Sequence, residues 1–226
     1  MTKAIDSFCL EKRKIMIAII DYDAGNIRSV EKALKFLGED AVITSDRDVI
    51  LNADGAILPG VGAFGVAMDK LRSRGLDKVI HEFVETKKPF LGICLGLQLF
   101  FESSEESPGV EGLGLLKGSI TKIPNEYTEN GTTVSQKVPQ IGWNSIEVNP
   151  SSKLFQGVKD GAYVYFVHSF YLTAENKDEV AATTHYGVDI HAAVEKDNVM
   201  ATQFHPEKSS DVGLKILSNF INMTKQ

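Results

Sequence analysis

The sequence predicts an α/β fold, with a parallel central sheet flanked by helices and an antiparallel β elaboration in the second half. Short runs that are apolar at successive positions, as in strands buried on both faces, alternate with helical patterns up to about residue 100. Beyond residue 112 the pattern changes to short β-like pieces between turn residues. The 226 residues can bury a core without disulfides or a structural metal, and no repeat or linker divides them.

The first elements follow in chain order. Residues 1–15 mix charge and polarity without a period, so we expect a disordered N-terminal extension there and a domain over residues 16–226. The apolar run 16–20 predicts the first central strand. Asn26 can cap a helix from residue 27 that stops at Gly38, where a left-handed residue is needed. Further strands and helices are predicted at 41–44, 55–58, 66–72, 76–86 and 90–93.

The second half is expected to be mostly β structure. Its strands are predicted at 119–123, 145–148, 163–168, 192–195 and 199–204. A final helix is expected over about residues 212–223. This order places the parallel sheet first and the antiparallel pieces after it.

The composition is that of a globular protein, with 43% hydrophobic and 24% charged residues. No apolar run approaches the ~20 residues of a membrane span, and no secretory signal opens the chain, so we expect a cytoplasmic protein without a membrane partner. The net charge of −6 argues against nucleic-acid binding. Cys9 and Cys94 are expected to be free thiols in that compartment.

Cys94 stands in the pattern Gly92-Ile93-Cys94-Leu95-Gly96, between a buried strand and an apolar helix. This is the nucleophile-elbow pattern with sulfur in place of oxygen. Glycine fits both flanks because a Cβ there would collide in so tight a turn, and the dipole of the new helix favours a thiolate. Taken alone, Cys94 fits equally well as a buried apolar residue, which most free cysteines are.

A base and an acid for this nucleophile are available near the C-terminus. His205 follows an apolar strand, and Pro206 fixes the local backbone. In an extended segment residues two apart point to the same side, so Glu207 can reach the imidazole of His205 and set its tautomer. His205 alone would be a loop histidine, but together with Cys94 it predicts a Cys-His-Glu triad.

The segment from Gly60 to Gly65 contains G-x-G-x-x-G after a strand and before a helix. A dinucleotide site needs this motif in the first βα turn, with a ribose-binding acid ~20 residues later. Here Pro59 intervenes and the strand is the third, so nucleotide binding is the weaker interpretation. The favoured interpretation is a glycine loop whose backbone N–H groups face the elbow and bind a developing oxyanion.

The other histidines and the single tryptophan carry weaker signals. His81 lies in a helical pattern, His168 in an aromatic run, and His185 and His191 are too far apart for a local pair. No spacing of His, Cys and Asp resembles a metal site, so we expect neither a metal nor another cofactor. Trp143 lies in a loop-like stretch, where it is either a core residue or an anchor at an interface.

Five segments carry a family resemblance. They are Asp21–Asn26, Pro59–Gly62, Gly92–Gln98, Gly142–Asn144 and His205–Ser209. Together they resemble the class I glutamine amidotransferases, and among them the glutaminase subunits of imidazole glycerol phosphate synthases. The elbow and the His-Pro-Glu run are shared by the whole class, whereas the other three segments point to these subunits. The resemblance spans about residue 16 to the C-terminus and implies the flavodoxin-like amidotransferase form of the predicted fold.

The resemblance implies hydrolysis of glutamine to glutamate and ammonia. Cys94 would attack the side-chain amide and His205 would protonate the departing ammonia, while Glu207 holds the ring and a γ-glutamyl thioester is then hydrolysed. The resemblance also implies donors to the oxyanion and contacts to glutamine. These are the backbone of Val61 or Gly62 and of Leu95 for the oxyanion, and Gln98, Glu106, Ser169 and Phe170 for glutamine.

The partner that the resemblance implies is a (β/α)₈ cyclase subunit in a heterodimer. It would receive ammonia through a tunnel and form imidazole glycerol phosphate and aminoimidazole carboxamide ribotide, in histidine biosynthesis. Asn26, Trp143 and Lys208 match interface positions. Gln140 stands where many relatives have histidine, which bears on the partner or the ammonia acceptor. Related subunits also supply ammonia for surface-glycan sugars, so that acceptor is kept as an alternative.

Two hypotheses of other classes remain. A cysteine-type α/β-hydrolase also carries a strand–elbow–helix nucleophile, but its acid normally precedes the histidine, whereas Glu207 follows His205. A non-enzymatic dinucleotide-binding or regulatory module predicts that a thiol-directed glutamine analogue leaves Cys94 unlabelled and that a nucleotide raises the melting temperature.

Overall fold

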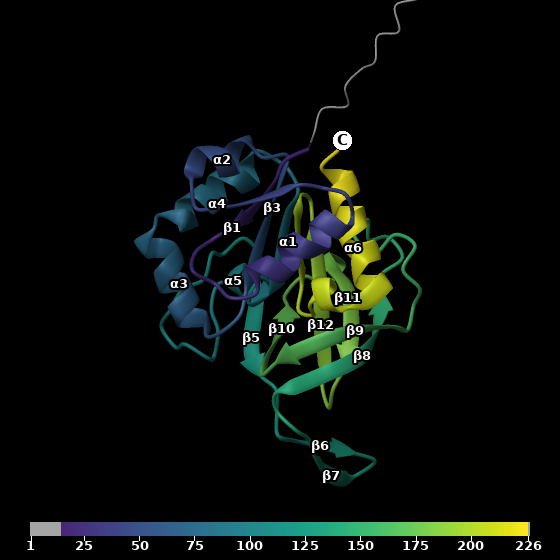
Figure 1. Ribbon diagram of the computed structural model, residues 1–226. Coiled ribbons are helices and arrows are strands. Elements are labelled where there is room, and N and C mark those ends of the chain that lie inside the picture. The colour runs from purple at the N-terminus through teal and green to yellow at the C-terminus, as the bar shows by residue number, and fades with distance from the viewer. Residues whose placement is uncertain (1–14, 226) are drawn as a thin grey trace, which may run out of the picture.

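A computed structural model describes residues 15–225 of the protein (Figure 1). The predicted N-terminal extension, apart from Ile15, and the predicted free thiol of Cys9 lie outside the described residues.

The centre of the structure is a nine-stranded sheet in the order β2-β1-β3-β4-β13-β12-β11-β8-β9. Its first part is parallel and consists of β2 (Ala41–Thr44), β1 (Ile17–Ile20), β3 (Gly55–Gly60), β4 (Phe90–Cys94) and β13 (Val199–Thr202). Every residue of β1, β3, β4 and β13 is buried, which for β1, β3 and β4 confirms the prediction drawn from their apolar runs. The prediction for β13 was wrong in one respect, because this strand was expected in the antiparallel second half but pairs in parallel with β4.

Helices cover both faces of the parallel part (Figure 1). One face packs against α2 (Arg47–Asn52), α3 (Phe64–Ser73), α4 (Leu76–Glu85) and α5 (Leu95–Leu99). The other packs against α1 (Ile27–Phe36) and α6 (Ser210–Met223). Side chains of β1 alternate between the two cores, with Ala18 and Ile20 in the first and Ile17 and Ile19 in the second.

The second half of the chain extends the sheet with antiparallel strands, as predicted. These are β12 (Asp189–Lys196), β11 (Val180–His185), β8 (Gln140–Val148) and β9 (Ala162–His168). Two small sheets pair β5 (Gly118–Lys122) with β10 (Phe170–Ala174), and β6 (Glu126–Glu129) with β7 (Thr132–Ser135). The β6–β7 hairpin projects from the body in Figure 1. Short 3₁₀ helices, η1 (Lys177–Glu179) and η2 (Pro206–Lys208), complete the chain.

Several predicted boundaries were wrong. β3 continues through Pro59 to Gly60, and α3 starts at Phe64 rather than Val66. The stretch around Trp143, predicted as loop-like, belongs to β8. The sequence patterns did not reveal α2, β6, β7, β10 and β11, of which β6–β7 had a usable signal. Its Asn130-Gly131 turn has positive φ at both residues, and Asn-Gly is a strong hairpin signal.

The predicted stop of α1 at Gly38 is confirmed by a φ of +84° at that glycine. The predicted cap at its other end is wrong. Asn26 occupies the N-cap position, with φ 71° and ψ 0°, but within the described residues its side chain makes no capping hydrogen bond to the helix. The side chain of Asn26 has a different partner, which is described below.

Candidate active site

Three segments meet at the carboxyl ends of neighbouring parallel strands, where open α/β sheets usually bind their ligands. Gly60 at the end of β3 is paired with Cys94 at the end of β4. His205 follows β13, the strand on the other side of β4. The topology therefore brings together the glycine loop, the cysteine and the histidine that the sequence patterns indicated.

Cys94 sits at a strained turn between β4 and α5. Its φ of 56° and ψ of −107° lie far from any conformation that a cysteine favours. A Cβ on Gly96 would lie 1.9 Å from the carbonyl oxygen of Leu58, and one on Gly92 would lie 2.8 Å from the Gly96 oxygen. Nearby backbone atoms thus leave no room for a Cβ on either flank, as predicted from the sequence. The turn has the geometry of a nucleophile elbow.

His205 and Glu207 form a buried pair beside this turn. His205 Nδ1 lies 2.7 Å from Glu207 Oε1, and both side chains are fully buried. The other ring nitrogen, Nε2, has no nitrogen or oxygen hydrogen-bond partner in the described chain. Since Nδ1–H donates to the carboxylate, Nε2 is left unprotonated in the neutral ring and can accept a proton.

The predicted pairing is correct, but its predicted local geometry is wrong. The segment after His205 is the 3₁₀ helix η2, not an extended strand, and Pro206 stands at its first turn. Ser209 fixes this turn, because its hydroxyl donates to the His205 carbonyl over 2.7 Å and accepts from the Tyr165 backbone N–H over 2.9 Å. The turn thus places His205 next to Glu207, two residues later in the chain, as an extended segment would also have done.

The electrostatics of the site favour a protonated imidazole. Burial lowers the pKa of His205, but its interactions with Cys94 and Glu207 outweigh burial and raise the pKa to about 9. The opposite holds for His168, where burial lowers the pKa to about 4, so this ring is neutral at pH 7. The site can therefore hold a thiolate–imidazolium pair next to a neutral histidine.

A pocket of about 280 Å³ opens onto Cys94. It gathers every residue that the resemblance implied for the oxyanion and for glutamine, since its lining is Val61, Gly62, Cys94, Leu95, Gln98, Glu106, Pro139, Val167, His168, Ser169 and Phe170. Leu95 is the first residue of α5, and Gly62 has φ +102°, which glycine adopts readily. Both oxyanion candidates are thus backbone groups at the mouth of one small pocket.

Two buried amides lie behind this pocket. Gln98 Nε2 donates to the Phe170 carbonyl and to Gln203 Oε1, each over 3.1 Å. Gln203 Nε2 in turn lies 3.8 Å from the Cys94 sulfur. Gln203 was not among the predicted site residues, although a glutamine inside the apolar run before His205 was an available signal.

Gln140 and Glu106 also have defined roles in the packing around the pocket. Gln140 is buried, and its Oε1 lies 3.0 Å from Nε2 of His168, whose Nδ1 lies 2.9 Å from the Phe170 carbonyl. Glu106 Oε2 accepts from the Phe64 backbone N–H over 2.7 Å, at the start of α3. Gln140 therefore contacts the pocket lining from inside the protein.

The residues assigned to an interface lie in different surroundings. Trp143 is 52% exposed on β8, with its ring 6.1 Å from that of Tyr165. Lys208 is exposed on η2. Asn26 is half-buried, and its side chain reaches the triad, with Nδ2 at 2.6 Å from Glu207 Oε1.

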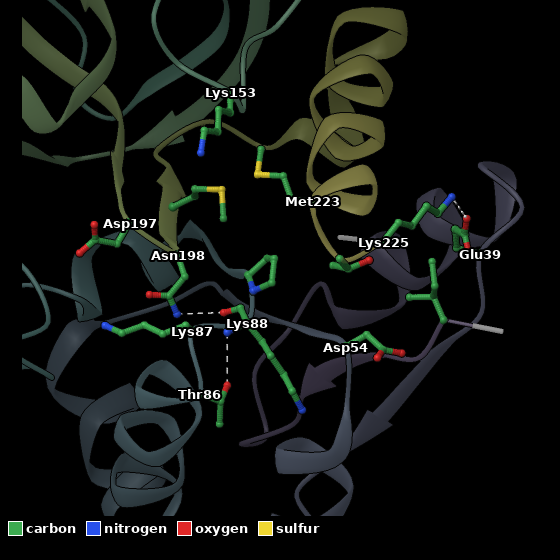
Figure 2. Close-up of a pocket in the computed structure, with 14 residues that line it drawn as sticks. Glu39, Asp54, Thr86, Lys87, Lys88, Lys153, Asp197, Asn198, Met223 and Lys225 are labelled. Atoms are coloured by element: carbon green, nitrogen blue, oxygen red, sulfur yellow. Dashed lines mark hydrogen bonds and ion pairs between the residues drawn. The ribbon is translucent and has the colours of Figure 1, made fainter. Parts of the chain in front are cut away.

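A larger hollow of about 1330 Å³ lies at the opposite end of the sheet (Figure 2). Asp54, Pro89 and Asn198 line it, and they come just before β3, β4 and β13. None of the described residues that line it is a histidine or a cysteine. These residues therefore offer neither a thiol nucleophile nor an imidazole base, and size alone does not make the hollow the active site.

Metal ligation and membrane spanning find no support in residues 15–225. No group of three or more His, Cys, Asp or Glu side chains is placed there to hold a metal ion. In the same part of the chain, no helix is long and apolar enough to cross a membrane.

Comparison with known proteins adds sequence relatives and structural neighbours. The family described as glutamine amidotransferase class-I matches residues 18–223. Imidazole glycerol phosphate synthase subunit HisH of Caldanaerobacter subterraneus subsp. tengcongensis is 50% identical over 210 residues, which cover 93% of this chain and 99% of the relative. The HisH subunit of Methanothermobacter thermautotrophicus is 48% identical over 210 residues, 93% of this chain and 100% of the relative.

The solved structures are more distant and show the fold alone. One described as a glutamine amidotransferase is similar with a TM-score of 0.70 at 20% identity, over 92% of this chain and 98% of that chain. PurLQS of Thermotoga maritima is similar with a TM-score of 0.67 at 21% identity, over 92% and 98%.

Proposed function

The chain belongs to the class I glutamine amidotransferases, among the HisH subunits of imidazole glycerol phosphate synthase, and we propose that Cys94, His205 and Glu207 hydrolyse glutamine in it. The observation that carries this proposal is the convergence of the strained cysteine turn and the buried His205–Glu207 pair next to one small pocket. Family membership excludes the α/β-hydrolase and the dinucleotide-binding module as descriptions of the chain.

The first half of the reaction forms a thioester. His205 holds at Nε2 the proton taken from the Cys94 thiol, and the Cys94 thiolate attacks the carbonyl carbon of the glutamine side chain. The tetrahedral intermediate collapses when His205 returns that proton to the departing nitrogen. Ammonia leaves, and the γ-glutamyl group stays on sulfur.

The second half releases glutamate. His205, now neutral, deprotonates a water molecule that attacks the thioester carbonyl, and the C–S bond breaks with its electron pair moving to sulfur. Glu207 keeps the ring in the tautomer with Nε2 facing the reaction throughout. Glutamate leaves, and the water proton stays on His205, so that the thiolate–imidazolium pair is restored.

The pocket lining supports specific roles in these steps. The backbone N–H groups of Leu95 and of Val61 or Gly62 are proposed to donate to the oxyanion, which develops at the mouth of the pocket. Gln98, Glu106, Ser169 and Phe170 are proposed to hold the glutamine. Gln203 supports Gln98 from behind, through the hydrogen bond described above.

Glutaminase activity is expected to fall as pH rises through about 9, because His205 then loses the proton that ammonia must receive. Protonation of His205 also contributes to the stability of the folded state, because its pKa is higher there than in the unfolded chain. This contribution is complete at pH values below the ordinary pKa of 6.5 and is lost as pH rises through about 9. A profile of kcat/KM from pH 6 to 10 measures this fall in activity. Glu207→Gln should move the fall to lower pH, and a profile that stays flat to pH 10 contradicts the role of His205 as the proton donor.

The relatives are subunits of a synthase, which points to a partner that uses the ammonia. We propose a heterodimer with a (β/α)₈ cyclase subunit that forms imidazole glycerol phosphate and aminoimidazole carboxamide ribotide. Trp143, Lys208 and Asn26 are assigned to its interface, and Trp143 is exposed as an anchor would be. We propose that the reaction takes place in the cytoplasm, a reducing compartment in which a free thiol persists.

Trp143→Ala is expected to weaken the complex with the cyclase by about 2 kcal/mol, because exposed tryptophans are frequent anchors of interfaces. The melting temperature of the isolated chain should change little, since the ring is 52% exposed. Calorimetric titration measures the affinity. Phe36→Ala is the control, an exposed aromatic at the far end of α1, and an unchanged affinity of the Trp143 variant would count against the interface.

The proposed function is tested by measuring glutamate release from glutamine, by the chain alone and with the cyclase subunit and its ribonucleotide substrate. Strong stimulation by the loaded partner is the expected result. Activity that ignores this partner moves the acceptor elsewhere, for example to a surface-glycan sugar. No release under any condition contradicts the glutaminase itself.

A further inference from the structure

Asn26 makes a contact with the triad that its position in the chain does not explain. Its Nδ2 lies 2.6 Å from Glu207 Oε1 and 3.3 Å from His205 Nδ1, across 181 and 179 residues of sequence. We propose that Asn26 is a positioning residue of the glutaminase reaction, which fixes the Glu207 carboxylate so that it can orient His205. The inference rests on the proposed function and deepens it.

The direction of each hydrogen bond follows from the chemistry of the three groups. The carboxylate of Glu207 can only accept, so His205 Nδ1–H and Asn26 Nδ2–H both donate to the same oxygen, Oε1. The short approach of Asn26 to Nδ1 is therefore a contact between two donors that share one acceptor. Asn26 interacts with the histidine through Glu207 and not directly.

The carboxylate has few other restraints. Glu207 Oε2 is buried and has no hydrogen-bond partner within residues 15–225. The side chain is fully buried, so water cannot supply a replacement donor at low cost. If Asn26 is removed, Glu207 keeps only His205 as a side-chain donor in the described chain, and the carboxylate can rotate about its own bonds.

The backbone at Asn26 is built to aim this side chain. Its φ of 71° is left-handed, a region that asparagine tolerates better than most other residues. The preceding residue is held as well, because a Cβ on Gly25 would lie 2.8 Å from Val61 Cγ2. The loop therefore lies against the glycine loop of the pocket on one side and delivers an amide to the triad on the other.

The titratable groups around the pair are few. His205 interacts with Cys94 from β4, with Glu207 from η2 and with His168 from β9, and Tyr22 from the loop after β1 interacts with Cys94. The neutral His168 and the buried Tyr22 add no charge at pH 7. A change in the reactivity of Cys94 caused by a variant of Asn26 would thus be transmitted through Glu207 and His205.

Two variants separate the side chain from the backbone. Asn26→Gly keeps the left-handed conformation and removes the amide. Asn26→Asp keeps the shape and replaces the donating group by an acceptor. The control is Asn176→Ala, which removes another Asn–Glu hydrogen bond, from Asn176 Nδ2 to Glu179 Oε1 over 3.2 Å, at η1.

Two readouts are measured. The first is kcat and KM for glutamine at a cyclase concentration that saturates each variant, because Asn26 is also assigned to the interface. Both Asn26 variants should lower kcat about 10- to 100-fold with KM nearly unchanged, because Asn26 does not line the pocket, while Asn176→Ala should leave both constants unchanged. A wild-type kcat in Asn26→Asp would overturn the proposal.

The second readout does not depend on glutamine or on a partner. It is the rate at which iodoacetamide alkylates Cys94 in the full chain at pH 7, followed by mass spectrometry. In Asn26→Gly the rate should fall several-fold, because the carboxylate that orients the imidazole beside the sulfur loses its second donor, whereas Asn176→Ala should keep the wild-type rate. A wild-type rate in Asn26→Gly would overturn the proposal. Failure of the proposed function would appear instead as absent glutamate release in the wild type.

Discussion

Cys94→Ala is expected to abolish glutamine hydrolysis, with kcat reduced at least about 10⁴-fold, because no other described residue in the pocket lining carries a thiol that can form the thioester. Gln98 and Gln203 are amides without nucleophilic character, and His168 is neutral, buried and held by Gln140 and the Phe170 carbonyl. The sulfur makes long hydrogen bonds, 3.9 Å to the Val167 carbonyl and 3.8 Å to Gln203, and it also interacts with His205. Removal of the thiol therefore leaves the packing nearly unchanged but takes away one of the two interactions that raise the pKa of His205.

The measurement is single-turnover glutamate formation by the variant and the wild type in the presence of the cyclase. Alanine shares the unfavourable backbone conformation of Cys94, so the two proteins should unfold at similar denaturant concentrations. Cys94→Ser is the matched control, since it keeps the shape and offers a much weaker nucleophile at neutral pH. Turnover retained in Cys94→Ala would remove the thioester mechanism, whatever the family resemblance.

Much of the fold could be predicted from local patterns. The unbroken apolar runs in β1, β3 and β4 predicted strands buried on both faces, and the helices between them predicted parallel pairing. Strands β10 and β11 were missed. Their half-exposed residues include polar ones that break the apolar pattern, and their place is set by pairing with distant strands, β5 for one and β12 with β8 for the other.

The candidate site also contains residues that local patterns predicted and residues that they did not. Cys94 and His205 each stand in a local pattern with a mechanical reason, and the structure brings both segments to one end of the sheet. Gln203 and Asn26 carry no such pattern, because their partners are 105 and 181 residues away. Sequence reasoning assigned Asn26 to a helix cap on local grounds, but its amide donates to Glu207.

Gly96→Ala is expected to lower the free energy of unfolding by roughly 3 kcal/mol or more and to remove activity. The added Cβ would lie 1.9 Å from the Leu58 carbonyl oxygen, where β3 passes under the start of α5. The oxygen belongs to the backbone and the position of the Cβ is set by the backbone, so no rotamer change can relieve the contact. Relief requires α5 to move away from β3, which would displace Leu95 and the pocket mouth. In an unconstrained helix the same change would stabilise by about 1 kcal/mol, so a net loss measures the clash.

Denaturant unfolding of the variant and the wild type measures this loss. Gly38→Ala is the control, because Gly38 has φ +84° and, apart from its chain neighbours, no described residue has an atom within 4 Å of the position that its Cβ would take. This variant therefore reports backbone strain without a clash, about 1 kcal/mol. If Gly96→Ala costs no more than Gly38→Ala, the turn can widen without penalty, and the strained elbow is not what fixes Cys94. A large cost at Gly96 alone ties the position of the nucleophile to one carbonyl oxygen of the neighbouring strand.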